Sequence, residues 1–204
     1  EPANNSSFVV FGKASGFSAT LDLSNLDGSN GFRLDEGATG NFTNISNAGD
    51  VNGDGFGDLI VGATGVSANG AGGSYVVFGK AAGFGAALNV SNLDGSNGFR
   101  LNGFAENDRP TVSNAGDVNG DGFGDLIVGG FNYSGSTNNA GFVVYGKTSG
   151  FSAALNLSSI DGSNGFRLDG GDANPVPIVS SAGDVNGDGF DDLVIGQPAY
   201  GAAS

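Results

Sequence analysis

The chain is built from a unit of 67 residues that repeats without insertion or deletion. The segment SNAGDVNGDGFGDLIVG fills residues 46–62 and recurs letter for letter at 113–129, and a copy with four changes fills 180–196. Flanking segments, such as SSFVVFGKASGF at 6–17, recur at the same step. Self-similarity at a fixed period indicates a repeated supersecondary unit that buries its apolar face against its neighbours.

Each unit carries four short runs that are typical of β-strands, and no unit shows the 3.6-residue apolar period of a helix. In the middle unit these runs are bounded by Gly, Asn and Asp, and they cover residues 110–115, 125–129, 141–146 and 164–168. The stretch AALNVSNLDG (86–95) reads as a loop with room for one more short strand. Four antiparallel strands per unit describe the blade of a β-propeller, so we predict an all-β chain of propeller blades. A β-solenoid is the alternative, but its coils are shorter than this repeat.

Composition excludes several classes of function. The chain has 21 acidic and 7 basic residues, a formal net charge of −14, and no Cys, His, Met or Trp. The scarce basic residues form no patch for phosphates, which excludes nucleic acid as a partner, and no apolar run is long enough for membrane insertion. Thiol and imidazole chemistry and Cys/His zinc sites are excluded as well.

Each unit crowds acidic residues into one nine-residue loop, here called the acidic loops: residues 50–58, 117–125 and 184–192. Calcium takes about 6–8 oxygen ligands, and loops of the form D-x-[DN]-x-[DN]-G supply them from alternate positions. Side chains at positions 1, 3, 5 and 9 and the carbonyl at position 7 would bind the ion, with Gly at position 6 allowing the bend. The sequence therefore predicts three Ca²⁺ ions, one per repeat, held by Asp50, Asn52, Asp54, Phe56 and Asp58; Asp117, Asn119, Asp121, Phe123 and Asp125; and Asp184, Asn186, Asp188, Phe190 and Asp192.

Other readings of the acidic loops fit less well. An EF-hand closes with Glu at position 12 and enters a helix, whereas position 12 here is Val61, Val128 or Ile195 within a predicted strand. A metal-free turn rich in Asp and Asn remains the alternative. Three copies in register, each with every ligand position filled, favour calcium, and Mg²⁺ fits less well because it prefers a tight octahedron with retained waters.

The unit AGDVNGDGFGDLIVGA…GGSYVVFGK resembles the FG-GAP repeat of integrin α-subunit propellers and of many bacterial secreted and surface proteins. The name matches the FG of Phe11-Gly12 and Phe78-Gly79 and the VGA that begins at Val61, while Tyr145 replaces the Phe in the third copy. The resemblance covers essentially the whole chain. It implies four-stranded propeller blades, with calcium in the loop between the first and second strands, and a role in adhesion, ligand binding or scaffolding.

The repeats are out of phase with the ends of the sequence. We expect one propeller segment that consists of a half-blade (1–38), two blades (39–105 and 106–172) and a second half-blade (173–204). Propellers close with about 4–8 blades. Either the chain is part of a longer propeller, which we favour, or its half-blades complete each other between chains, two of which would form a six-bladed ring.

Two functions of different classes follow. The first is a non-catalytic, calcium-stabilised module outside the cell, secreted or at the cell surface, that acts in adhesion or binds a protein or carbohydrate ligand through the divergent loops at 35–43, 102–111, 169–177 and 132–139. The alternative is an accessory or scaffold propeller of a larger secreted multidomain protein or enzyme. An active site within this chain is disfavoured, since the acidic residues outside the acidic loops are few and scattered.

Overall fold

The computed structural model describes residues 6–36, 41–65, 71–106, 108–132, 139–169 and 178–196. Within these ranges the regular elements are β-strands and single turns of 3-10 helix, with no α-helix, which confirms the all-β prediction. The strands are β1 Ser6–Val10, β2 Gly31–Asp35, β3 Asn41–Gly49, β4 Asp58–Thr64, β5 Ala71–Val77, β6 Ala87–Asn89, β7 Gly98–Glu106, β8 Thr111–Gly116, β9 Asp125–Asn132, β10 Asn139–Val144, β11 Ala154–Asn156, β12 Gly165–Asp169, β13 Ile178–Gly183 and β14 Asp192–Gly196. The 3-10 turns are η1 Leu23–Asn25, η2 Val90–Asn92 and η4 Leu157–Ser159.

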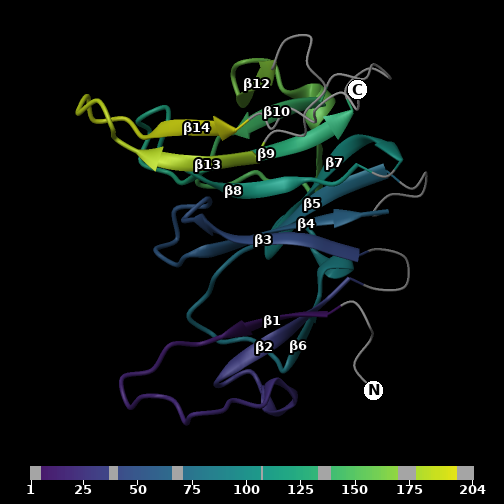
Figure 1. The fold of residues 1–204 in the computed structure, drawn as a ribbon, viewed down its shortest axis with the longest axis vertical. Coiled ribbons are helices and arrows are strands. Elements are labelled where there is room, and N and C mark those ends of the chain that lie inside the picture. The colour runs from purple at the N-terminus through teal and green to yellow at the C-terminus, as the bar shows by residue number, and fades with distance from the viewer. Residues whose placement is uncertain are drawn as a thin grey trace, which may run out of the picture.

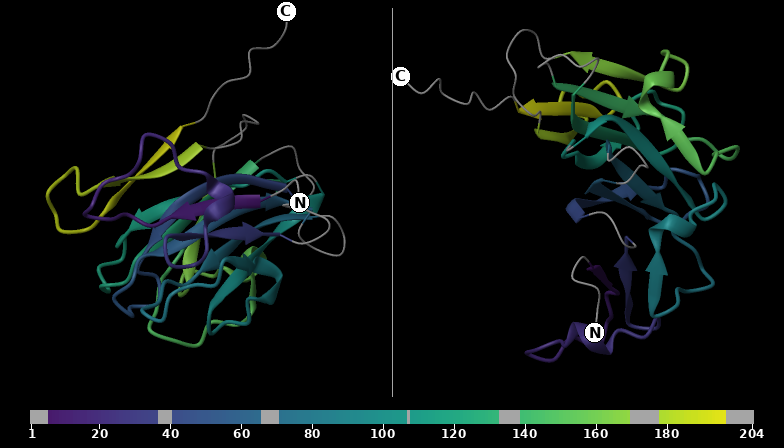
Figure 2. Two further views of the ribbon diagram at one scale, coloured as in Figure 1. Left: turned by 90° about the horizontal axis from the view of Figure 1, so that it is seen from below. Right: turned by 90° about the vertical axis from the view of Figure 1, so that its right-hand side faces the viewer.

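The strands form four sheets that follow one another in the order of the sequence (Figure 1). The sheets have the strand orders β1-β2-β6, β3-β4-β5-β7-β11, β8-β9-β10-β12 and β13-β14. The right-hand view of Figure 2 shows the N-terminal sheet at one end of the molecule and the sheets of the C-terminal half towards the other end. The second, third and fourth sheets meet through their first strands, since β3 contacts β8 and β8 contacts β13.

The second and third sheets are each built on a four-stranded antiparallel meander, which is the blade of a β-propeller. In the second sheet, Leu59 lies opposite Val77 and Ile60 lies opposite Val76. The third sheet repeats this register with Leu126 opposite Val144. The four strands predicted for the middle unit are all present, with bounds that differ by one to three residues.

A short strand from each unit extends the sheet of the unit before it. Strand β6 pairs in parallel with β2, and β11 pairs in parallel with β7, so Leu88 lies opposite Leu34 and Leu155 opposite Leu101. These strands come from the stretch that we predicted as a loop able to carry a further strand. They connect consecutive units by backbone hydrogen bonds, including one of 2.9 Å from the Arg100 N–H to the Ala153 carbonyl.

Successive residues of a strand point to opposite sides of the sheet, and in both blades the side chains of both faces are buried. Val76 packs in the core between the second and third sheets, whereas Val77 packs in the core between the first and second. Paired phenylalanines close each core. Phe84 stacks on Phe32 with ring centroids 4.2 Å apart, and Phe151 stacks on Phe99 at 4.7 Å.

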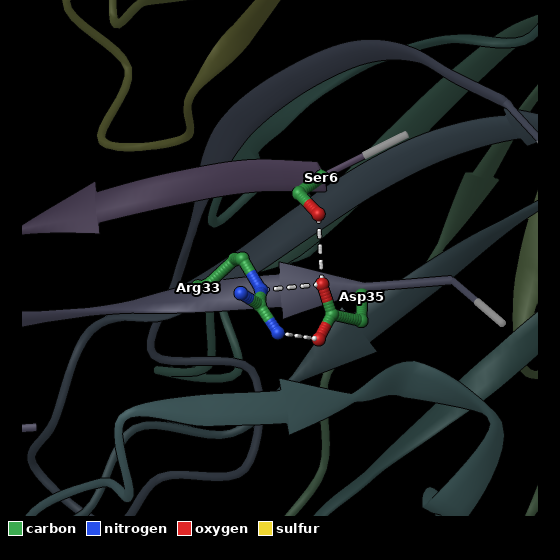
Figure 3. A network of polar contacts seen from close by, with 3 residues as sticks. All are labelled: Ser6, Arg33 and Asp35. Atoms are coloured by element: carbon green, nitrogen blue, oxygen red, sulfur yellow. Dashed lines mark hydrogen bonds and ion pairs between the residues drawn. The ribbon is translucent and has the colours of Figure 1, made fainter. Parts of the chain in front are cut away.

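The recurring DGSNG turns contain an aspartate that holds the turn together. In the first DGSNG turn, Asp27 Oδ1 accepts hydrogen bonds from the Ser29 backbone N–H and hydroxyl at 2.9 and 2.7 Å. Strand β2, which follows this turn, carries an ion pair between Arg33 and Asp35, in which Arg33 Nε donates to Asp35 Oδ1 at 2.7 Å (Figure 3). The Ser6 hydroxyl donates to the same carboxylate. Arg33 is therefore paired within its own strand.

Candidate metal-binding loops

The acidic loops occupy equivalent places in three sheets, where they join β3 to β4, β8 to β9 and β13 to β14. These are the loops between the first and second strands of each unit, which is where the resemblance placed the calcium site. Each loop leaves the first strand through a glycine and enters the second strand at its position-9 aspartate.

In the first loop, the position-1 carboxylate organises the bend. Asp50 Oδ1 accepts a hydrogen bond from the Asp54 N–H at 3.0 Å, and Oδ2 accepts one from the Gly55 N–H at 2.9 Å. Asn52 Oδ1 also accepts from the Asp54 N–H at 3.0 Å, and the Asn52 amide donates to Asp54 Oδ2 at 3.0 Å. Asp54 Oδ1 in turn accepts from the Phe56 N–H at 2.9 Å. The side-chain oxygens of positions 1, 3 and 5 are therefore gathered on one turn of backbone.

The second and third loops reproduce this geometry. The Gly122 N–H donates to Asp117 at 2.8 Å, and the Gly189 N–H donates to Asp184 at 2.9 Å. Position-3 asparagines and position-5 aspartates make the same bonds in both loops. Position 6 must be glycine, because Gly122 has a φ of +88°, a left-handed conformation that a side chain disfavours.

The position-9 aspartates of the first two loops differ from the other loop acids because they are buried, whereas Asp192 in the third loop is half-buried. Asp58 is 1% exposed, and its two oxygens accept hydrogen bonds from the Val51 N–H at 2.8 Å and the Gly79 N–H at 2.7 Å. Asp125 makes the same bonds to Val118 and Gly146. This side chain ties the acidic loop to the turn that follows the third strand. A carboxylate oxygen has two acceptor sites, so these bonds leave capacity for a cation.

Electrostatics separates the position-9 carboxylates from those in the bend. Burial, together with repulsion from the nearby Asp54 and Asp50, raises the pKa of Asp58 to about 6, although the two backbone hydrogen bonds act to lower it. Burial likewise raises the pKa of Asp125 to about 6. Backbone hydrogen bonds, first that from Gly189, lower the pKa of the exposed Asp184. The first and second loops thus each combine the carboxylates of the bend with one buried carboxylate whose ionised form is disfavoured.

Within the described ranges, no three His, Cys, Asp or Glu side chains are arranged as a metal-ligand group. The predicted ligand set includes an asparagine and a backbone carbonyl, which are not members of such a group. The loop carboxylates accept hydrogen bonds from backbone N–H groups. The chemistry of the donors nevertheless fits a hard cation, since the loop offers carboxylate, amide and carbonyl oxygens and no nitrogen or sulfur ligand.

Neighbouring acidic loops also contact each other, which the sequence did not predict. The Gly124 N–H donates to the Asp50 carbonyl at 2.9 Å, and the Asp191 N–H donates to the Asp117 carbonyl at 3.1 Å. Asp191 additionally accepts a hydrogen bond from the Asp117 N–H at 2.8 Å. The only sequence signal was that Asp191 replaces the glycine found at position 8 in the other two copies.

Parts of the predicted ligand-binding loops lie outside the described residues, namely positions 37–40, 107, 133–138 and 170–177. The segment predicted as a loop at 102–111 is described apart from residue 107, and there 102–106 form the end of β7 and Thr111 begins β8. Of the flanking residues, Asp108 is 1% exposed and accepts a hydrogen bond from the Phe104 N–H at 3.0 Å. This aspartate therefore has a structural contact at the base of its loop.

The FG-GAP repeat family model matches residues 42–77 and 177–204. These two segments are FG-GAP repeats. The first match spans nearly all of β3, then the acidic loop, β4 and β5, which are the elements that carry the site described above. A search of the curated proteins finds no match.

FG-GAP repeats occur in integrin α-like β-propellers, and they support a propeller-type ligand-binding module of the extracellular kind. Domains built from these repeats are generally non-catalytic, generally bind protein ligands and are typical of extracellular proteins. Within the described residues, no helix is long and apolar enough to cross a membrane.

Proposed function

We propose that this FG-GAP chain is a calcium-stabilised, non-catalytic module that acts outside the cell in adhesion or in binding a protein or carbohydrate ligand. The observation that carries the proposal is the threefold repetition of one loop geometry, in which the oxygens of positions 1, 3 and 5 converge on a backbone bend. Carboxylates held this close repel each other, and a divalent cation would remove that repulsion.

Calcium would be held by the fifteen predicted loop residues and would supply charge neutralisation and cross-linking of each bend. The chain itself contributes the preorganised backbone. The Asp50 carboxylate already holds the bend through two N–H groups, and Asp58 anchors the loop to the next turn. Sites of this kind in extracellular modules bind calcium with dissociation constants of about 10⁻⁴–10⁻³ M, which favours a location where free calcium is high.

The environments of four acids in the recurring turns support a non-catalytic role. Asp22, Asp27, Asp94 and Asp161 each accept hydrogen bonds from a serine within their own turn, or from its backbone N–H, and their pKa values are lowered by those bonds. Groups used in this way are ionised turn-formers and not general acids. The alternative proposal, an accessory or scaffold propeller of a larger secreted protein, has the same loops, and the sequence of the complete parent protein distinguishes the two.

Calcium titration of the protein tests the proposal. Thermal unfolding is measured in chelator and at increasing calcium, with magnesium as a matched control, and bound calcium is counted by equilibrium dialysis. Because calcium binds only the folded loops, the melting temperature should rise with calcium and three ions should bind per chain. Equal melting temperatures in chelator and in millimolar calcium, with no bound ion, would refute the proposal.

A further inference from the structure

The acidic loops of neighbouring blades are packed against each other by a ring contact that recurs from one pair of loops to the next. The Phe123 ring of the second loop lies over Gly53 of the first, so closely that a Cβ atom on this glycine would overlap the ring. Phe190 of the third loop makes the same contact with Gly120 of the second. In both pairs, position 4 of one loop thus contacts position 7 of the next.

Backbone hydrogen bonds join the same parts of each pair. The Gly124 N–H donates to the Asp50 carbonyl at 2.9 Å, and the Asp191 N–H donates to the Asp117 carbonyl at 3.1 Å. These bonds run from position 8 of one loop to position 1 of the loop before it. A ring contact and a hydrogen bond, which are independent of each other in their chemistry, therefore recur together.

These contacts lie among the predicted calcium ligands. Positions 1, 3 and 5 would supply side-chain oxygens, and the contacts use the carbonyl of position 1 and the glycine at position 4. Positions 7 and 9 would supply a carbonyl and a carboxylate, and the contacts use the ring of position 7 and the N–H of position 8. An ion in one loop would therefore fix the surface on which positions 7–9 of the next loop rest.

The turn that follows β10 provides a further connection between the first two loops. The Lys147 N–H donates to the carbonyl of Val51 in the first loop at 2.9 Å. The preceding Gly146 N–H donates to Oδ1 of Asp125 in the second loop at 2.8 Å. Val51 and Asp125 are both fully buried. Two consecutive residues of one turn thus hold position 2 of one loop and the position-9 ligand of the next.

We propose that the acidic loops bind calcium cooperatively, so that an ion in one loop raises the affinity of the neighbouring loop. This inference rests on the proposed function and adds how its sites act together. Binding that orders a loop costs conformational entropy, and a neighbour whose positions 7–9 are already held loses less of it. Linkage makes the effect reciprocal, and a coupling of ordinary size changes affinity by about 5-fold or more.

Repulsion between the bound ions acts in the opposite direction, and salt separates the two effects. At about 0.1 M salt, charges more than about 10 Å apart are largely screened from each other, whereas the contacts between loops are short-ranged. Raising the salt concentration should therefore weaken each site but strengthen the cooperativity. A coupling carried by charge alone would weaken together with the sites.

Asp191 should make the second and third loops the more strongly coupled pair. It occupies position 8, where the first two loops have glycine, and its carboxylate accepts a hydrogen bond from the Asp117 N–H at 2.8 Å. The equivalent Gly124 has no side chain to accept from the Asp50 nitrogen, which lies 2.9 Å from its Cβ position. Asp191 is thus a positioning residue that holds the first predicted ligand of the loop before it.

Variants that leave two sites test the coupling, with bound calcium measured by equilibrium dialysis. Asp54→Asn and Asp188→Asn each leave two neighbouring loops, whereas Asp121→Asn leaves the first and third loops, which belong to sheets that are not neighbours. Asparagine keeps an acceptor for the position-7 N–H in all three variants. We expect a Hill coefficient above about 1.3 for the first two variants and of about 1 for the third. Equal coefficients in the three variants would overturn the proposal.

Exchanges at position 8 separate the contact from its charge. In the Asp54→Asn protein, Asp191→Gly should reduce the coupling between the second and third loops while two ions remain bound. Asp191→Asn keeps an acceptor for the Asp117 N–H and should retain most of the coupling, and a coefficient that neither change alters would refute the role of Asp191. Independent binding of three ions by the natural protein would overturn the cooperativity and leave the proposed function standing. Absence of bound calcium would refute both.

Discussion

Phe123 of the second acidic loop lies directly against Gly53 of the first. A Cβ atom placed on Gly53 would be 2.4 Å from Phe123 Cε1, which is far inside van der Waals contact. Phe190 stands in the same relation to Gly120. The glycine at position 4 therefore leaves the space in which the aromatic ring at position 7 of the next loop packs. This contact links the predicted metal sites of neighbouring blades.

Gly53→Ala should destabilise the protein for two reasons. Its φ of +70° is strained for alanine, at a cost of about 1–2 kcal/mol, and the methyl group must displace the Phe123 ring, which adds about 1–3 kcal/mol. The measurement is the free energy of unfolding in urea. Gly83→Ala is the matched control, because Gly83 has a φ of +72° with open space around its Cβ position. Equal losses for the two variants would show that the ring contact contributes nothing.

Asp54→Asn should remove calcium from one loop without harming the metal-free fold. Asparagine retains an oxygen for the Phe56 N–H, which Asp54 Oδ1 now accepts at 2.9 Å, but it loses the negative charge. We expect bound calcium to fall from three ions to two, while the melting temperature in chelator stays equal or rises slightly because repulsion is relieved. Asp94→Asn, in an exposed turn, should leave three ions bound. Three ions bound to the Asp54→Asn variant would contradict the predicted ligand set.

Asp125→Asn should destabilise the protein even in chelator. Asp125 is fully buried, and its two oxygens accept from the Val118 N–H at 3.0 Å and the Gly146 N–H at 2.8 Å. Asparagine offers only one acceptor oxygen, so one buried N–H loses its partner at a cost of about 1–3 kcal/mol. Chemical unfolding in chelator measures this loss. The exposed Asp161→Asn is the control and should change stability little, and a similar result for both variants would argue against the anchoring role.

The fold could be predicted from the sequence because its signals are local and repeated. The Gly- and Asn-bounded runs indicated strands, and a run such as 110–115 differs from the observed β8 by one residue at each end. Because the unit repeats at a fixed step, each of these local patterns occurs more than once in the sequence. The bend chemistry of the acidic loops was equally readable, since it depends on residues within nine positions of one another.

Contacts between residues that lie far apart in the sequence could not be predicted in the same way. The buried Asp58 carboxylate accepts a hydrogen bond from Gly79, which lies 21 residues away. The Phe123 ring packs against Gly53, a glycine in another blade. A repeat pattern shows which residues are equivalent but not which of them meet across the interface. The burial of Glu36 could not be predicted for a further reason: its equivalent in the next unit is Gly103, so the repeat offers no second acidic residue at this position.

Glu36 should make stability depend on pH near neutrality. Its side chain is 7% exposed, and neither carboxylate oxygen has a hydrogen-bond partner among the described residues. Burial raises its pKa from the ordinary value of 4.5 to about 7. The folded state therefore holds a proton that the unfolded chain releases near pH 4.5. The stabilisation is complete below pH 4.5 and is lost as the pH rises through 7.

Glu36→Gln removes this titration while it keeps the size of the side chain. Between pH 5 and 8.5, at constant calcium, the free energy of unfolding should fall more steeply for the natural protein than for the variant. At the upper end the variant should be the more stable, by no more than about 3 kcal/mol. Other groups titrate in both proteins and cancel in the comparison, including Asp58 and Asp125. Parallel pH profiles would mean that Glu36 is solvated or paired in solution, because only a desolvated carboxylate gives this difference.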